Sequence, residues 1–254
     1  MNEVSHYIKT LRTRDLGTVY RELRSRFTRE SPKVCVERLL DLLSEFSAVF
    51  TFFITGQAAK RNKAAIKRII DAGHEIACHG YYHKRFDLMG YNEISKDIKQ
   101  SMDLFKDYFG YSLKGFRAPY LCNSEGLIKV LRDLGFSWSS SIRSESGMFV
   151  YPQGLWELPI KIDDWEILIK NNKNGAKSLF HEMTRKARGG SVFLLHPWRV
   201  GQRRYIDQLE EFLEKCEIGF CSMSDLAKEG KGIALTGDIG ELSLSEIMQR
   251  ALGL

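Results

Sequence analysis

The feature that most constrains this fold is a regular alternation of short apolar runs with amphipathic segments. Residues 48–54 form a nearly continuous β-prone run, which is typical of a strand covered on both faces. We predict strands at 48–54, 76–78, 113–116, 136–142, 156–162, 191–195 and 218–221, and helices at about 32–46, 58–72, 92–109, 123–135, 176–187, 203–215 and 223–229. This alternation predicts an α/β fold with βαβ units and a parallel sheet in one domain, and leaves open whether the sheet closes into a barrel.

Two histidines follow the predicted strand at 76–78. They are His79 and His83, and Gly80 between them allows a sharp turn. Two histidines four residues apart can bind one divalent cation, from a helical face or from a tight loop. Such a pair alone is more often a surface coincidence. Here the metal interpretation gains weight because polar groups also follow other predicted strands.

Arg117 and His196 also come directly after predicted strands. In parallel α/β sheets, ligands bind at the carboxyl ends of the strands, so we expect these groups to share one site. Arg117 could orient a carboxylate through two hydrogen bonds, and the alternative is a surface arginine. His196 could act as a general acid that protonates a leaving amine, and the alternative is a structural histidine.

A third polar group, Asp163-Asp164-Trp165, ends the predicted strand at 156–162. The two carboxylates could raise the pKa of His196 or bind substrate, and the alternative is a capped, exposed turn. Trp165 and Trp198 could stack on sugar faces, although buried aromatic residues more often belong to the core.

Composition limits the classes of partner and compartment. The chain has 254 residues and a formal net charge of +6, which favours anionic partners, but the basic residues before position 30 read more simply as a solvated helix face. We therefore expect no nucleic-acid partner. The five cysteines form no CxxC pair, residues 1–30 lack an apolar leader core, and no run is long enough to span a membrane. We expect a cytoplasmic protein of unknown oligomeric state.

Four motifs together resemble the polysaccharide deacetylase superfamily (NodB homology, carbohydrate esterase family 4). They are TFFITG at 51–56, GHEIACHGYYH at 73–83, GFRAPY at 115–120 and LLHPW at 194–198. The amino-acid sequences of these motifs are most similar to those of deacetylases associated with exopolysaccharide biosynthesis. The resemblance implies a distorted, TIM-like (β/α) barrel of about seven parallel strands, and removal of acetyl groups from amino-sugar polymers with a divalent metal, zinc being favoured.

The resemblance also implies roles for individual residues. His79 and His83 match the two metal-binding histidines, Arg117 the arginine that orients the base, and His196 the general acid. The backbone amide at Tyr120 matches one that helps to hold the oxyanion. Asp163, Asp164 and Trp165 match an acid–tryptophan motif that lines the pocket and tunes the acid, and Trp198 is a candidate substrate contact.

The chain departs from the family at its start, where a strand ending in two acids is expected. The best local substitute is residues 27–32, in which Arg29 would replace the base and Glu30 could be the third metal ligand. We expect the first strand to be missing or replaced by N-terminal helices, and the metal to be absent if no third ligand completes the site. We divide the chain into a basic helical extension (1–31), a deacetylase-like domain (32–230) and a C-terminal tail (231–254).

Three functions follow in order of preference. The first is a metal-dependent deacetylase acting on an acetylated amino-sugar polysaccharide or its precursor, with an unidentified base. The second is a catalytically impaired member of the fold that binds carbohydrate or a partner protein. Loss of a positioned base typically costs about 10²- to 10⁴-fold in rate. Because the two acids are missing, we rank the second function only slightly below the first. The third, ranked last, is binding to nucleic acid or to an anionic surface through the basic N-terminal helices.

Overall fold

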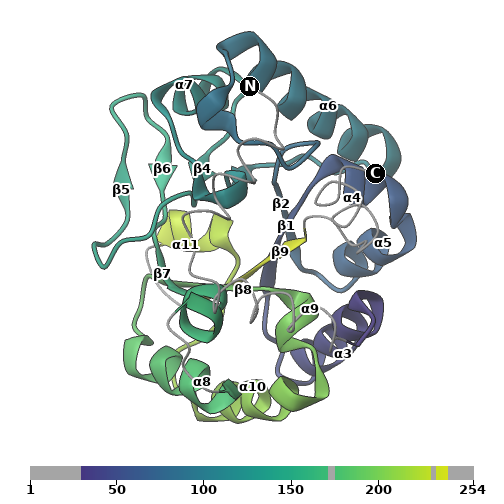
Figure 1. Ribbon diagram of the computed structural model, residues 1–254, viewed down its shortest axis with the longest axis vertical. Helices are drawn as coiled ribbons and strands as arrows, with labels where there is room; N and C mark the ends of the chain where they lie inside the picture. The colour runs from purple at the N-terminus through teal and green to yellow at the C-terminus, as the bar shows by residue number, and fades with distance from the viewer. Residues whose placement is uncertain (1–29, 171–174, 230–232, 240–254) are drawn as a thin grey trace.

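A curled, mostly parallel sheet forms the centre of the molecule, with helices packed around its outer face (Figure 1). The structure is a computed structural model and describes residues 30–170, 175–229 and 233–239. The sheet order is β5-β6-β4-β3-β2-β1-β9-β8-β7, and only β5 pairs antiparallel with its neighbour. The strands are β1 (Phe50–Ile54), β2 (Glu75–Cys78), β3 (Gly115–Phe116), β4 (Trp138–Ser139), β5 (Phe149–Val150), β6 (Trp156–Glu157), β7 (Ile160–Asp163), β8 (Ser191–Leu195) and β9 (Ile233–Ile239).

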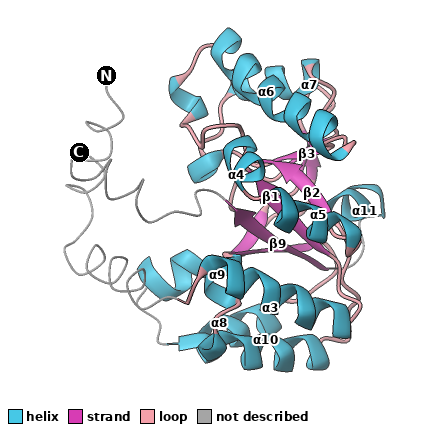
Figure 2. Ribbon diagram, turned by 90° about the vertical axis from the view of Figure 1, so that its right-hand side faces the viewer, coloured by secondary structure: helices cyan, strands magenta, loops and turns pink. Residues whose placement is uncertain are grey.

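The helices alternate with the strands as the sequence predicts. They are α3 (Pro32–Glu45), α4 (Gly56–Arg61), α5 (Lys63–Asp71), α6 (Tyr91–Phe109), α7 (Glu125–Asp133), α8 (Gly175–Lys186), α9 (Pro197–Val200), α10 (Arg203–Lys215) and α11 (Met223–Glu229), with short 3-10 turns at Phe86–Leu88 and Pro119–Leu121 and a π-helical turn at Glu166–Lys170. Figure 2 shows α6 and α7 on one side of the sheet and α3, α8 and α10 on the other. Among the described residues, every helix is too short or too polar to span a bilayer.

Two apolar clusters hold this arrangement. The larger one fills the space between the outer face of the sheet and the surrounding helices. The smaller one lies on the inner face, where Phe53, Trp138 and Leu194 pack against Met223 and Leu226 of α11. In Figure 1, α11 lies inside the ring of the other helices, so it fills the interior of the half-barrel.

Hydrogen bonds attach α11 to the amino ends of the strands. The Thr51 hydroxyl of β1 accepts a hydrogen bond from the Met223 amide at 3.0 Å. Ser224 donates its amide and its hydroxyl to the carboxylate of Glu75, the first residue of β2. Because α11 closes the amino end, the opposite, carboxyl end remains for a site.

The α/β barrel prediction is confirmed, with corrections to individual elements. The predicted helix at 58–72 is two helices that meet at Asn62, and the predicted strand at 156–162 divides into β6 and β7 in separate parts of the sheet. The predicted strand at 218–221 is wrong: this segment joins α10 and α11, and its apolar residues Ile218 and Phe220 pack against the larger core cluster instead.

The largest correction concerns the C-terminal part of the chain. Residues 233–239, predicted as a tail, form β9, which pairs in parallel with β1 on one side and β8 on the other. The helix α3 leads into β1 and would normally be the crossover from a strand beside β1. That position is not empty or replaced by helices, because β9 occupies it. The central sheet therefore extends beyond residue 230, while residues 1–29 lie outside the described part.

Candidate active site

The carboxyl edge of the sheet brings together the predicted polar residues. His79 follows β2, Arg117 follows β3, and Asp164 and His196 follow β7 and β8. Because these strands are parallel, their ends lie on one edge, as the sequence pattern predicts.

The two imidazoles of the HxxxH segment lie next to each other, with ring centroids 4.9 Å apart. The turn between them uses left-handed backbone at Gly80 (φ +72°) and at His83 (φ +54°), a conformation that is uncommon for a residue with a side chain. His79 is buried, and its Nδ1 lies 2.9 Å from the main-chain carbonyl oxygen of Arg117. A carbonyl oxygen only accepts, so Nδ1 donates this hydrogen bond, and in the neutral ring Nε2 is then the nitrogen that could bind a metal ion.

This donor set fits a divalent metal ion. A metal-binding histidine usually donates its other ring N–H to a carbonyl or carboxylate, which fixes the tautomer and the ring orientation, and His79 has this arrangement. His83 adds a second imidazole at a suitable spacing. Two imidazoles suit zinc, although a catalytic zinc site requires a third protein ligand.

Arg117 is fully buried and connects several strands at this edge. Its Nε and Nη2 donate to the Ser140 carbonyl and hydroxyl, both at 2.8 Å, and its Nη1 donates to the Thr236 hydroxyl of β9 at 3.0 Å. The guanidinium carbon also lies 3.9 Å from the centroid of the Phe53 ring. Arg117 is therefore a fixed positive charge inside the barrel and not a surface arginine.

His196 and Asp164 form the strongest electrostatic pair of the site. The His196 Nδ1 lies 2.5 Å from the Asp164 carboxylate, which also accepts the His196 amide at 3.0 Å, and Arg199 Nε lies 3.4 Å from it. Burial opposes the charged imidazole, but the Asp164 charge and hydrogen bond outweigh it and raise the pKa of His196. Burial likewise opposes the carboxylate, yet His196 and Arg199 together lower the pKa of Asp164. The expected influence of an aspartate on His196 is thus present, and it comes chiefly from Asp164.

Asp163 has different partners. It forms an ion pair with Arg143 and accepts the Trp165 amide at 2.9 Å, so it holds the turn after β7. Asp163, Asp164 and His196 offer ligand atoms within 4.8 Å of one another, a spacing that a metal ion could use. However, arginines already neutralise both carboxylates. This group therefore fits a tuned acid better than a metal centre.

The three predicted aromatic contacts differ in exposure. The Tyr120 side chain is 60% exposed, and its ring centroid lies 4.7 Å from that of His83. Tyr120 itself has φ +60°, so the turn after Pro119 is tightly bent. Trp198 is half-buried with its ring 5.4 Å from the His196 ring, whereas Trp165 packs against the core.

Both carboxylate oxygens of Glu30 already have partners from two helices. Its two carboxylate oxygens accept from Arg38 Nη2 at 2.7 Å and from the Arg203 amide at 2.8 Å. Glu30 therefore joins α3 to the start of α10, and the predicted metal ligation by Glu30 has no support among these contacts. Arg29 lies outside the described residues.

Sequence reasoning missed β9. The run at 233–239 contains β-prone residues, which are a signal for a strand, but Gly237 and Asp238 read as turn residues. The structure explains the glycine: a Cβ at position 237 would lie 2.6 Å from Pro197 and 2.8 Å from Phe50. Gly237 therefore marks close packing within a strand and not a turn.

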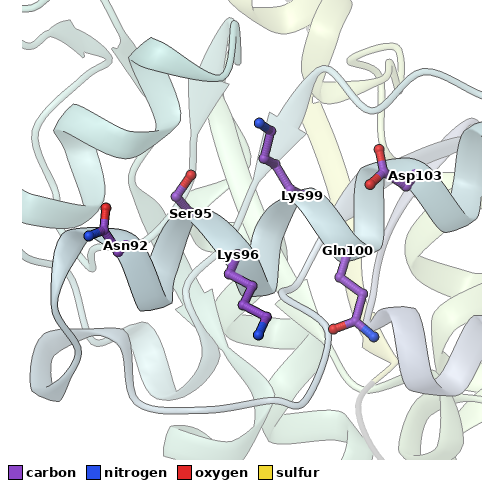
Figure 3. A pocket seen from close by; sticks show the side chains of 6 residues that line it. All are labelled: Asn92, Ser95, Lys96, Lys99, Gln100 and Asp103. Carbon is purple, nitrogen blue, oxygen red and sulfur yellow. The ribbon is translucent and has the colours of Figure 1, made fainter.

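A shallow hollow on α6 differs in composition from the site at the carboxyl edge of the sheet. Figure 3 shows it on the outer face of α6, lined by Asn92, Ser95, Lys96, Lys99, Gln100 and Asp103. All six side chains come from one helix and are polar or charged, as expected for a solvated helix face. We give it no part in the site.

Comparison with known proteins agrees with this geometry. The family model described as "Polysaccharide deacetylase" matches residues 30–138. Over this segment the chain is similar to the polysaccharide deacetylases. The peptidoglycan-N-acetylmuramic acid deacetylase of Bacillus subtilis is 26% identical over 193 residues, which cover 76% of this chain and 66% of that protein. The first four curated relatives are covered over only 30–66% of their own lengths.

Solved structures confirm the deacetylase fold. A protein from Mycobacterium smegmatis assigned to the polysaccharide deacetylases superposes with a TM-score of 0.69 at 27% identity, over 78% of this chain and 77% of that one. A family 4 carbohydrate esterase pseudoenzyme from Bacillus anthracis has a TM-score of 0.61 at 16% identity, over 83% of this chain and 66% of that one. At this low identity the second match bears on the fold alone.

Proposed function

We propose that this polysaccharide deacetylase homologue is a metal-dependent hydrolase that removes acetyl groups from an amino-sugar polysaccharide or its precursor. Two observations support the proposal. The imidazole pair of His79 and His83 and the His196–Asp164 pair lie at the same edge of the sheet, and the curated relatives include peptidoglycan and chitooligosaccharide deacetylases.

The observation that carries the proposal is the register of β9. Phe53 of β1 pairs with Asp238. Leu195 of β8, the residue before His196, pairs with Gly237, the residue before Asp238. Arg117 donates to Thr236, two positions before Asp238 on the same strand. We propose that Asp238 is the general base that sequence reasoning could not find.

In this proposal the site contains both a proton acceptor and a proton donor for amide hydrolysis. A divalent metal held by His79 and His83 would polarise the acetyl carbonyl and lower the pKa of a bound water. In our proposal Asp238 accepts a proton from the attacking water as the carbon–oxygen bond forms. His196 then donates its Nε2 proton to the sugar nitrogen as the carbon–nitrogen bond breaks, which yields acetate and a free amine.

Other residues orient these groups. Asp164 holds the His196 ring through Nδ1, which leaves Nε2 directed to substrate, and its charge keeps the ring protonated to higher pH. Arg117 would stabilise the carboxylate of the base. The exposed ring of Tyr120 beside His83, and Trp198 beside His196, are suited to stack against sugar faces.

The test measures metal content and acetate release. We expect the purified protein to bind zinc after reconstitution and to release acetate from acetylated chito-oligomers. The Asp238→Asn variant should lose about 10²- to 10⁴-fold in kcat with zinc content retained, because a positioned base is removed. Asp71→Asn, at an exposed position at the end of α5, is the matched control. A protein that binds no zinc and releases no acetate would exclude this function.

One observation favours the alternative of a non-catalytic carbohydrate- or protein-binding member. Ile239 follows Asp238, so β9 carries a single acid where the family resemblance implies two, and a third metal ligand is not identified. A member of this fold is described as a pseudoenzyme, so the fold can exist without the activity. Binding of chito-oligomers without acetate release would support this alternative. The cytoplasmic location stays a prediction.

A further inference from the structure

A carboxylate interrupts the buried face of α6. Besides Asp97, that face consists of Ile94, Ile98, Ser101, Leu104 and Phe105, and Asp97 has only 6% of its surface exposed. Burial raises the pKa of Asp97, which means that the charged form is costly at this place. An aspartate in an apolar stripe therefore needs a compensating role.

Asp97 bonds to the turn that joins the two imidazoles. Its Oδ1 accepts the backbone amide of Tyr81 at 2.6 Å, and the neighbouring Tyr82 amide also acts to lower the pKa of this carboxyl. A hydrogen bond from an amide to a carboxylate is charge-assisted and about twice as strong as a neutral one. Asp97 thus compensates its own burial through the backbone of the turn.

The other side of the same turn is held by α4. The amides of Gly56 and Gln57, in the first turn of that helix, donate to the carbonyls of Gly80 and Tyr81 at 3.0 and 3.1 Å. Space around the turn is also filled, since a Cβ at Gly80 would lie 3.0 Å from the Asp97 Oδ1 and 2.8 Å from the Phe86 ring. The turn is therefore clamped between α4 and α6.

We propose that Asp97 is a positioning residue for the metal site, which fixes the turn at residues 79–83 so that both imidazoles face one ion. The proposal rests on the metal-dependent function above. It explains why His83 keeps a left-handed backbone, a conformation that costs free energy unless its surroundings impose it. Without the carboxylate, the turn is free to relax and the two ligands separate.

Zinc affinity tests this role. In Asp97→Asn the bond to the Tyr81 amide loses its charge assistance, and an NH2 group replaces the second carboxylate oxygen. We expect zinc to bind 10- to 100-fold more weakly, the usual effect of removing a group that orients a metal ligand. Asp103→Asn, on the exposed face of the same helix, is the matched control and should bind zinc like the wild type. Affinity is measured by competition with a chromogenic chelator.

Backbone amide hydrogen exchange gives a second readout that needs no metal. We expect slow exchange at the Tyr81 amide in the wild type and fast exchange there in Asp97→Asn. An affinity equal to that of Asp103→Asn, or fast exchange at the Tyr81 amide in the wild type, would overturn the role of Asp97. If Asp97→Asn does not fold, the wild-type exchange rates decide. Zinc binding by the wild type tests the proposed function, whereas the ratio of variant to wild type tests this inference.

Discussion

Replacing Asp164 by Asn should shift the pH range of activity downward. The Asp164 carboxylate is fully buried and lies 2.5 Å from His196 Nδ1, so removing its charge removes a charge-assisted bond. Such a bond contributes about 1.5–3 kcal/mol. At 1.36 kcal/mol for each pKa unit, the pKa of His196 should fall by about one to two units. An asparagine oxygen can still accept from Nδ1, so the ring orientation is kept.

The sign of the effect follows from the role of His196 as an acid. Activity requires the protonated ring and is lost as pH rises through its pKa, so the basic limb of the kcat profile should move to lower pH by about one to two units. The assay is acetate release from acetylated chito-oligomers across pH, with Asp207→Asn, an exposed position on α10, as the control. A basic limb at the same pH in wild type and variant would refute the reasoning.

The same pair predicts a stability profile. Asp164, with its lowered pKa, stabilises the fold above the ordinary aspartate value of 3.8, and this contribution is lost as pH falls through its folded pKa. His196, with its raised pKa, stabilises the fold below the ordinary histidine value of 6.5, and this contribution is lost as pH rises through its folded pKa. Urea titrations should show the full contribution between these values in the wild type and a flatter profile in Asp164→Asn; equal profiles would contradict it.

Three further outcomes are expected. His79→Ala should abolish zinc binding and leave the circular dichroism spectrum unchanged. His181→Ala, at an exposed position, should change neither zinc binding nor the spectrum. Zinc retained by His79→Ala would show that the ligand set is wrong. Gly115→Ala should lower the free energy of unfolding by roughly 1–3 kcal/mol, because its Cβ would lie 1.9 Å from the Trp138 ring, and urea melts that match the wild type would contradict this. Truncation after residue 229 should broaden or abolish cooperative unfolding, since the sheet loses β9; an unchanged transition would show that β9 is dispensable.

Most of the fold could be predicted because its signals are local. The buried strands β1 and β8 are continuous apolar runs, and α6 has a clear apolar stripe ended by Gly110 in a left-handed conformation. The residues at the carboxyl edge could be predicted for the same reason, since each directly follows such a strand. His196 and Arg117 lie where parallel topology requires them.

The remaining features depend on contacts that are distant in sequence. Asp97 reads as one more polar residue on a helix until its bond to the Tyr81 amide is seen. Gly237 reads as a turn until Pro197 and Phe50 are seen to press against it. Glu30 was considered because of its position before α3, whereas the strand that takes that place in the sheet comes from the other end of the chain.

The place of β9 has a consequence for how the site is assembled. The imidazole pair and Arg117 belong to the half of the sheet that ends at β1, whereas Asp164 and His196 belong to the half formed by β7 and β8. The two halves pair through β9, and a bridge between Arg143 and Ile160 also joins them on the far side. The proposed metal ligands and the proposed general acid are therefore brought into register by β9, which lies between β1 and β8. In our proposal the same strand also carries the base, so the step that completes the barrel is the step that completes the catalytic residues.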